Sequence, residues 1–453
     1  MTRASTIAVL DIGKTNVKLV VFNQTGQVLW QASQPNAPAL DGPYPHADVE
    51  KIWHFLLSAL SEASVRHKID VIVPATHGAT GALVDQNGLV LPIMDYEYEA
   101  IGTIEPDYVR LRPPFGKTFS PSLPNGLNLG RQLAFQAAHY PEGFGRAQYL
   151  LTYPQYWLWR LTGVLASEIT SLGCHTDLWE PENARPSSLA VALGLDRQLP
   201  PLQPAWTRAG RVRPGIIAQT GLPAHVEVLC GIHDSNAALL PYLLTRANPF
   251  TLISTGTWVI LMCVRHSLQH LRAQDDMLAN VDALGRPTAC ARFMGGREYG
   301  ALAGDCDTIA MPEHIACLIR DDIFALPSFS PHGGPFAHRI GQIVGRLAPD
   351  RRSGLASLYC ALMCDIILDR LEIRDGEIIV DGIFAGNAAF CGLLAQLRPD
   401  QEIRCTHDSA GTARGAALLA NWPDCDMTVE TTRVSPWTVP GLAAYRRRWA
   451  LMQ

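Results

Sequence analysis

The chain has 453 residues, of which 47% are apolar and 17% charged, and its formal net charge is −5 at pH 7. This length predicts two domains, and the composition is typical of a globular enzyme rather than a disordered or coiled-coil chain. The small negative charge gives no electrostatic reason to expect nucleic acid or an anionic membrane as a partner. No run approaches the roughly 18 apolar residues of a membrane span. The 11 scattered cysteines, never in C-x-x-C spacing, and an N-terminus without room for a signal peptide predict a cytoplasmic protein.

The first motif is a predicted β-hairpin close to the N-terminus. Within residues 7–22, an apolar run, the polar turn Asp-Ile-Gly-Lys-Thr-Asn (11–16) and an apolar, β-branched run follow one another. The turn offers backbone N–H groups and the ammonium of Lys14 beside the carboxylate of Asp11, which suits a magnesium-bound polyphosphate. A P-loop also ends in Gly-Lys-Thr, but it needs a glycine where this chain has Ala8 and a helix where this chain has a strand-like run. A plain surface hairpin is the alternative.

The rest of the first half alternates predicted strands and helices. An amphipathic helix follows Asp48, which is a plausible cap, and a later strand runs directly into a helix that begins at Ser235. The expected elements are a helix at 47–63, a strand at 69–74, a hairpin at 82–90, an irregular segment at 100–125, helices at 126–140 and 149–162, a surface excursion at 181–215, a strand from 226 and a helix at 235–244.

A second strand–turn–strand pattern, at 250–264, repeats the opening hairpin with the turn Ser-Thr-Gly-Thr. The repeat indicates a duplicated half, so we expect a domain boundary near residue 245. Cys360 and Cys364 share one face of an apolar helix, which indicates two buried thiols rather than a metal site. The second half is expected to contain a loop at 327–345, a helix at 353–371, a strand at 377–381, a Gly-rich turn at 382–387, a helix from 389 and a last helix at 410–420. Strands that alternate with helices imply α/β layers.

Taken together, these motifs resemble the FGGY carbohydrate kinases, a branch of the actin-like ATPase fold, over nearly the whole chain. The segments that carry the resemblance are Asp-Ile-Gly-Lys-Thr-Asn (11–16), Thr-His-Gly (76–78), Gly-Ile-His-Asp (231–234), Ser-Thr-Gly-Thr (254–257), Asp-Gly-Ile-Phe-Ala-Gly-Asn (381–387) and the closing helix (411–420). The resemblance implies an α/β fold of two actin-like (ribonuclease H-like) domains, residues 1–245 and 246–453, with an interdomain cleft. It also implies an enzyme that uses ATP and Mg²⁺ to phosphorylate a small sugar, with the two hairpins facing one another across the nucleotide.

The resemblance implies roles for single residues. Asp234, just before a helix, is the expected catalytic base and, with Asp11, a ligand of Mg²⁺. The alternatives are a helix cap for Asp234 and a turn-stabilising Asx residue for Asp11. Lys14 stands where the family commonly has a small hydroxyl residue, and a phosphate contact is expected from it. The expected ATP contacts are Gly13, Lys14, Thr15, Thr255, Gly256 and Thr257 at the phosphates, Gly296 at the wall of the nucleotide pocket, and Gly382, Ala385 and Asn387 at the adenosine.

The sugar is expected to contact His77, Gly78, Tyr96, Glu97, His233 and Asp234, with ordinary polar loops as the alternative reading of the first four. The segment that begins Pro92-Ile93 lacks the Arg that the family often has there, which leaves the choice of sugar open. A ketose of the L-rhamnulose, L-fuculose or xylulose type is expected. A polyol kinase and a non-catalytic or chaperone-like actin-fold ATPase are the alternatives, and a monomer or homodimer is expected. A sugar-sensing repressor is disfavoured because no helix-turn-helix precedes the hairpin.

Overall fold

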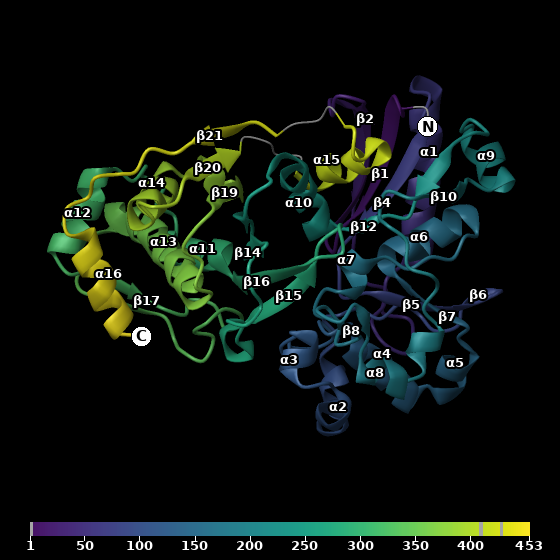
Figure 1. Ribbon diagram of the computed structural model, residues 1–453, viewed down its shortest axis with the longest axis horizontal. Helices are drawn as coiled ribbons and strands as arrows, with labels where there is room; N and C mark the ends of the chain where they lie inside the picture. Colours follow the sequence, from purple (N-terminus) through teal and green to yellow (C-terminus); the bar gives the residue numbers. More distant parts are fainter. Residues whose placement is uncertain (1–2, 407–410, 426–428) are drawn as a thin grey trace. The chain divides into compact units, whose positions relative to one another are not determined.

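The computed structural model describes residues 3–406, 411–425 and 429–453 as a mixed α/β chain (Figure 1). The chain divides into two compact units. The first comprises Met1–Thr245, Ala279–Pro287 and Ala410–Thr428, and the second comprises Arg246–Leu278, Thr288–Ser409 and Val429–Gln453. Two segments from late in the sequence therefore belong to the first unit, which the sequence pattern did not predict.

The first unit is built on a sheet with the strand order β10-β11-β4-β1-β2-β3, in which β12 also pairs with β4. Strands β1, β2 and β3 form an antiparallel meander, whereas β1, β4 and β11 run parallel. The apolar runs of the opening hairpin and of β4 are buried in this sheet, which fixes their register because a shift by one residue would expose them. The strands of the first unit are β1 (Thr6–Ile12), β2 (Asn16–Asn23), β3 (Val28–Pro35), β4 (Val71–Thr76), β5 (Gly81–Asp85), β6 (Gly88–Leu89), β7 (Tyr149–Thr152), β8 (Trp179–Glu180), β9 (Arg185–Pro186), β10 (Arg208–Arg211), β11 (Glu227–Leu229) and β12 (Ile232–His233).

Helices cover this sheet and form a second apolar cluster beside it. The first helix begins where the sequence predicts, because the side chain of Asp48 accepts a hydrogen bond from the Lys51 N–H at 3.0 Å and caps it. The helices of the first unit are α1 (Val49–Arg66), η1 (Glu99–Ile104), α2 (Glu105–Leu111), α3 (Phe115–Thr118), α4 (Leu129–His139), α5 (Pro141–Arg146), α6 (Tyr153–Thr162), α7 (Ile169–Leu172), α8 (Ser188–Ala192), η2 (Leu195–Arg197), α9 (Pro214–Thr220), α10 (Asp234–Thr245), α15 (Gly411–Leu418) and η6 (Leu419–Asn421).

Three expectations for this unit are wrong. The segment 100–125 is not irregular, because it contains most of η1 together with α2 and α3. Residues 149–152 do not open a helix but form β7, which pairs antiparallel with β5. Part of the expected surface excursion at 181–215 is β10, an edge strand held by β11. The partner of β7, strand β5, lies far away in the sequence, so the local pattern could not reveal this pairing.

The second unit repeats the strand order of the first. Its sheet runs β15-β16-β14-β13-β19-β20-β21, with β16, β14 and β13 antiparallel and β13, β19 and β20 parallel. The duplication inferred from the two hairpins is therefore confirmed at the level of topology. The strands of this sheet and the small sheet beside it are β13 (Phe250–Thr255), β14 (Val259–Val264), β15 (Met277–Val281), β16 (Pro287–Phe293), β17 (Phe324–Leu326), β18 (Gln342–Val344), β19 (Glu377–Gly382), β20 (Ile403–Thr406) and β21 (Thr431–Arg433).

The core helix of the second unit carries Cys360 and Cys364, and both thiols are buried, as the sequence predicts. The expectation that the helix at 410–420 is the last one is wrong. A further helix, α16, follows, and its Tyr445 and Trp449 donate hydrogen bonds to carbonyl oxygens beside and within β17 at 2.6 and 2.7 Å. The helices are η3 (Ala273–Asp275), α11 (Gly295–Ala303), α12 (Pro312–Arg320), η4 (Pro349–Arg351), α13 (Arg352–Arg370), η5 (Ile383–Gly386), α14 (Ala388–Leu397) and α16 (Leu442–Leu451).

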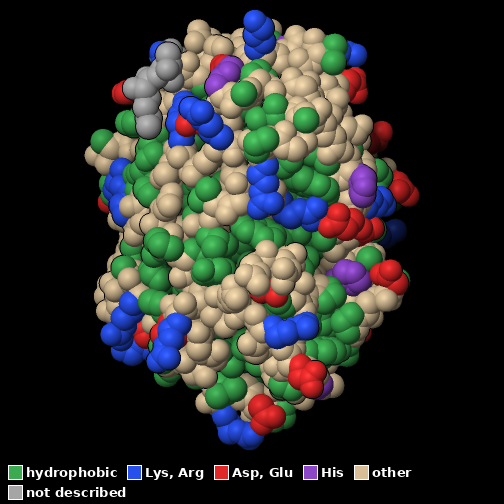
Figure 2. Space-filling model, turned by 90° about the vertical axis from the view of Figure 1, so that its right-hand side faces the viewer, with side chains coloured by type: hydrophobic (Ala, Val, Ile, Leu, Met, Phe, Trp, Pro, Cys, Tyr) green, Lys and Arg blue, Asp and Glu red, His purple; other side chains and the backbone are tan. Residues whose placement is uncertain are grey.

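Within the described ranges, none of the helices combines the length and the apolar character needed to cross a lipid bilayer. On the face shown in Figure 2, Lys and Arg side chains are interspersed with Asp and Glu rather than gathered into one patch.

Candidate active site

Three of the predicted site segments meet in the first unit because of strand pairing. Strand β4 runs parallel to both β1 and β12, and Thr76 stands opposite Ile12 in one neighbour and His233 in the other. The residues that follow these three positions therefore leave the sheet at the same edge. His77 follows Thr76, and Asp234 follows His233. These two residues lie far apart in the sequence but come to the same edge of the sheet.

Asp234 is the first residue of α10, and 32% of its side chain is exposed. Its Oδ1 accepts hydrogen bonds from the Ser235 N–H at 2.6 Å, from the Ser235 hydroxyl at 3.2 Å and, at 3.1 Å, from Nε2 of His233. Burial alone would raise the pKa of Asp234, but the hydrogen bond and charge of His233, with smaller contributions from His77 and the Ser235 N–H, hold it below its usual value. Asp234 is therefore ionised at neutral pH and reachable from solvent.

His233 is held from behind by residues that the sequence analysis missed. Its backbone N–H donates to the Thr170 hydroxyl at 3.0 Å, and that hydroxyl donates to Oε2 of Glu168 at 2.6 Å. A Cβ atom on Gly78 would lie 2.7 Å from Nε2 of His233, so only glycine lets the ring approach here. Burial would lower the pKa of His233, but Cys174 and the hydrogen bond and charge of Asp234 raise it well above its usual value. His233 is therefore a cation that faces Asp234.

Asp11 lies one residue before the end of β1, directly opposite Lys18 of β2. Burial raises the pKa of Asp11 to about 6; the charge of Lys18 lowers it, and the charge of Asp234 raises it further. The two carboxylates thus interact electrostatically, and each is more costly to ionise in the presence of the other.

A divalent cation fits this donor set, since it would neutralise two carboxylates that repel one another and would be bound by the oxygen ligands that Mg²⁺ prefers. Protein side chains alone do not complete such a site. Among the residues that the structure describes, no group of three or more His, Cys, Asp or Glu side chains could hold a metal ion. Mg²⁺ typically keeps several waters and takes substrate phosphates as further ligands, so two carboxylates are compatible with it.

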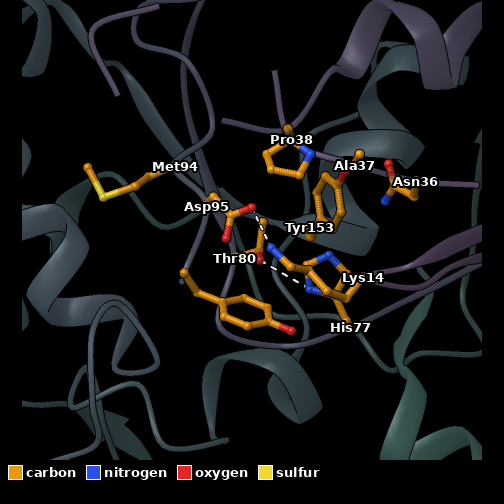
Figure 3. Close-up of a pocket in the computed structure, with 11 residues that line it drawn as sticks. Lys14, Asn36, Ala37, Pro38, His77, Thr80, Met94, Asp95 and Tyr153 are labelled. Carbon is orange, nitrogen blue, oxygen red and sulfur yellow. Dashed lines mark hydrogen bonds and ion pairs between the residues drawn. The ribbon is translucent and has the colours of Figure 1, made fainter. Parts of the chain in front are cut away.

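The predicted sugar residues His77 and Tyr96 both line a pocket in the first unit. Figure 3 shows His77 in this pocket. Nδ1 of His77 lies 3.0 Å from the carbonyl oxygen of Gly78, which can only accept, so Nδ1 carries the proton. Burial is the largest of the effects on the pKa of His77 and lowers it, so the ring is neutral and Nε2 can accept a hydrogen bond. The residues that line the pocket are Lys14, Asn36, Ala37, Pro38, Ala47, His77, Thr80, Met94, Asp95, Tyr96 and Tyr153.

Lys14 lies in this pocket and pairs with acidic residues of the loop that follows Pro92-Ile93. Its ammonium binds Oδ2 of Asp95 and lies 3.3 Å from Oε2 of Glu97. Tyr96 and Glu97 were predicted from the sequence as sugar contacts, but Asp95, which stands next to them in the same segment, was not. Asn36 was not predicted either. Its side chain donates to the Gly13 carbonyl at 2.8 Å and its backbone N–H donates to the Thr15 carbonyl at 2.8 Å, which fixes the turn of the first hairpin.

In the second unit, the second hairpin and the Gly-rich turn are tied together through Thr255. Its hydroxyl donates to the Asp381 carbonyl at 2.5 Å and accepts from the Phe384 N–H at 2.9 Å. Gly382 has a φ of +83°, and a Cβ atom there would lie 2.1 Å from the Thr255 carbonyl oxygen. A Cβ atom on Gly296, near the start of α11, would lie 2.1 Å from the Gly256 carbonyl oxygen. These two glycines allow three backbone segments to meet where the sequence analysis expects ATP.

The remaining predicted nucleotide residues of the second unit belong to the same hairpin and the same Gly-rich turn. Thr257 is exposed at the tip of the hairpin, and Ala385 lies in η5, between Gly382 and Gly386 in the sequence. Asn387 caps α14, because its Oδ1 accepts from the Phe390 N–H at 3.0 Å, and its Nδ2 donates to the Ser357 hydroxyl at 3.1 Å. Its amide therefore has a structural task that the sequence pattern did not indicate. That the two hairpins face one nucleotide across a cleft stays a prediction.

Comparison with known proteins gives consistent results for both halves of the chain. Residues 247–428 match the family described as "Carbohydrate kinase FGGY, C-terminal domain". The L-fuculokinase of Escherichia coli K12 is 29% identical over 272 residues, and the probable L-xylulose kinase of Pasteurella multocida is 24% identical over 294 residues. These alignments cover 56% and 59% of this chain and only 56% and 57% of the two relatives. A carbohydrate kinase from Novosphingobium aromaticivorans, known from its crystal structure, is 34% identical to this chain in sequence. The two structures match with a TM-score of 0.91, and the match covers 100% of this chain and 99% of that chain.

Proposed function

The chain belongs to the FGGY carbohydrate kinases, with their actin-like fold of two domains, and on that premise we propose that it transfers the γ-phosphoryl group of ATP to a hydroxyl of a small sugar. The observation that carries the proposal is the ionised, solvent-reachable carboxylate of Asp234 in the same unit as a pocket lined by polar and aromatic side chains. Transfer from ATP to an alcohol requires a base near the attacking oxygen, positioned polar groups and charge neutralisation at the phosphates.

Asp234 is the proposed base. The three hydrogen bonds described for its carboxylate all converge on Oδ1, which leaves Oδ2 for the proton of a sugar hydroxyl. His233 keeps the carboxylate ionised and fixes its orientation, and the helix N-terminus favours the same charge. On the other side of the acceptor, neutral His77 accepts a hydrogen bond from a further hydroxyl through Nε2. Gly78, Tyr96 and Glu97 complete the proposed sugar contacts.

Asp11 and Asp234 would hold Mg²⁺, and the bound ion would neutralise phosphate charge. Asp11 is suited to this part because burial raises its pKa to about 6, so a cation is the natural compensation for its charge at neutral pH. The proposed contacts of ATP are Gly13, Thr15, Thr255, Gly256 and Thr257 at the phosphates, Gly296 at the pocket wall, and Gly382, Ala385 and Asn387 at the adenosine.

We propose the corresponding division of labour between residues 1–245, with the sugar and the base, and residues 246–453, with the adenosine. A ketose is the proposed acceptor, supported by relatives named L-fuculokinase and L-xylulose kinase. A monomer or homodimer in the cytoplasm completes the proposal.

The test is ADP release by the full chain supplied with Mg²⁺-ATP, measured with and without each of the ketoses L-fuculose, L-xylulose and L-rhamnulose. L-fucose, the aldose that corresponds to L-fuculose, is the matched control acceptor. The proposal expects ADP release that depends on a ketose. ADP release that no sugar stimulates would contradict it.

The residue-level test is Asp234→Asn, which keeps the shape and the Oδ1 acceptor but cannot take the proton. General-base catalysis typically contributes about 10²–10⁴-fold, or about 3–5 kcal/mol of barrier, so turnover should fall by that factor while sugar and ATP still bind. Asp41→Asn is the control, since 90% of the Asp41 side chain is exposed. If Asp234→Asn kept more than about a tenth of the turnover, Asp234 would not be the base.

A further inference from the structure

Lys14 is expected from the sequence to contact phosphate, and it lies in the pocket of the first unit. As a phosphate ligand its ammonium would have to be available, yet here it is engaged by Asp95 and Glu97. It also lies 4.8 Å from the centroid of the Tyr96 ring, over its face. Figure 3 shows Lys14 and Asp95 joined across the pocket, with His77 beside them.

Asp95 connects Lys14 to the shape of the loop that carries Tyr96. One carboxylate oxygen, Oδ2, accepts from Lys14, and the other, Oδ1, accepts from the Glu97 N–H at 2.8 Å in an Asx turn. The backbone of Asp95 is bound on both sides, since its N–H donates to the Pro45 carbonyl at 2.9 Å and its carbonyl accepts from the Tyr98 N–H at 3.1 Å. Any change in the ammonium is therefore transmitted to the sugar loop.

The charges around the pocket also limit what it can bind. One ammonium faces two carboxylates, and the side chains of Lys14 and Asp95 are only 22% and 7% exposed, so solvent screens this pair weakly. A sugar acid would bring its carboxylate into this negative field, whereas a neutral polyhydroxylated sugar would meet donors and acceptors without that repulsion.

Building on the proposed function, we propose that Lys14 is a specificity-determining residue of the sugar pocket rather than a ligand of the phosphates of ATP. Two of its three N–H donors are directed to Asp95 and Glu97, and the third is offered to a hydroxyl of a neutral acceptor. Through Asp95 it also sets the position of Tyr96. The acceptor class is neutral ketoses, and aldonic acids are rejected.

The experiment compares Lys14→Met with Lys14→Arg, with Lys51→Met as the matched control because Lys51 is exposed on α1. In Lys14→Met we expect the apparent KM for L-xylulose or L-fuculose to rise about 10–100-fold, while the KM for ATP stays within twofold. Lys14→Arg retains the charge and the pairing with Asp95, so it should recover much of the loss. A rise in the KM for ATP with an unchanged KM for the sugar would overturn the proposal and return Lys14 to the phosphates.

Two further measurements keep the proposal independent of turnover and of folding. Calorimetric titration of L-xylulose and L-fuculose into the ATP-free protein should show the same loss of sugar affinity in Lys14→Met. The double variant Lys14→Met/Asp95→Asn should bind the ketose no more weakly than the worse of the two single variants. If the wild type binds a ketose but releases no ADP, the proposed function fails while this comparison still decides the role of Lys14. D-Gluconate should bind at least 100-fold more weakly than the better ketose, and equal binding would overturn the proposed acceptor class.

Discussion

Replacing Asp11 by asparagine should make the ligand-free protein more stable at neutral pH, although the same change should impair its use of Mg²⁺. Burial raises the pKa of Asp11 from its ordinary value of 3.8 to about 6. Because the folded state holds this proton more tightly than the unfolded chain does, stability falls as the pH rises from 3.8 to about 6, and the loss is complete above that range.

The size of the effect follows from the same shift. At about 1.4 kcal/mol per pH unit, ionised Asp11 costs the folded state at most about 3 kcal/mol at pH 7.5. Asp11 is partly exposed, so solvent screening should reduce this to about 1–2 kcal/mol. Asparagine has nearly the same shape and no charge, so Asp11→Asn should recover that amount. At roughly 2–4 °C per kcal/mol, the melting temperature should rise by several degrees.

The assay is thermal unfolding in EDTA at pH 7.5 and at pH 4.5, where Asp11 is largely protonated in the folded state and the gain should shrink. Mg²⁺ should then stabilise the wild type more than the variant. Asp70→Asn is the matched control, and its effect on the stability should have the opposite sign. Asp70 accepts hydrogen bonds from the N–H groups of Ser5 and Thr6 at 2.8 and 3.0 Å; burial opposes them, but the pKa of Asp70 is lowered on balance. An Asp11→Asn protein that is less stable than the wild type in EDTA at pH 7.5 would refute the reasoning.

Two further predictions concern the packing beneath the site and the adenosine turn. Gly415→Ala would place a Cβ atom 1.9 Å from the Ala237 carbonyl oxygen of α10, so it should cost about 1–3 kcal/mol of stability, whereas Gly300→Ala, with open space around it, should gain about 0.5–1 kcal/mol. Equal melting temperatures of the two variants would contradict this. Asn387→Leu should raise the apparent KM for ATP and also remove the α14 cap, whereas Asn387→Asp keeps a capping acceptor and isolates the nucleotide contact. An unchanged KM for ATP in Asn387→Leu would remove Asn387 from the adenosine site.

The parts of the fold that could be predicted from the sequence are those whose pattern is local. The two hairpins alternate apolar runs with short polar turns, and α1 combines an apolar face with the cap Asp48. By contrast, β10 reads Arg-Ala-Gly-Arg and has no strand propensity of its own; it is a strand because β11 pairs with it. Helix α16 was missed because it is rich in arginine, and only Leu442, Tyr445 and Trp449 of this helix are buried.

The same distinction applies to the candidate site. Asp234 and His77 stand in short motifs that can be recognised in the sequence. Asn36, Asp95 and Thr170 act by holding another residue, and each of those partners lies far away in the chain or is a backbone group. No local pattern marks such positions, so they become visible only when the coordinates bring the partners together.

The duplicated sheet explains how one topology can serve two kinds of ligand. In both units a hairpin turn lies beside the loop that follows the parallel neighbouring strand, because Ile12 stands opposite Thr76 in one and Thr255 opposite Gly382 in the other. In the first unit the residue after that strand is His77, whose ring can meet a hydroxyl. In the second unit the strand ends in Gly382, where a Cβ atom would collide with the backbone of the hairpin. Side chains at the first edge suit recognition of individual hydroxyls, and bare backbone at the second suits close approach to a nucleotide, so the proposed division of labour follows from which residues occupy equivalent positions of one fold.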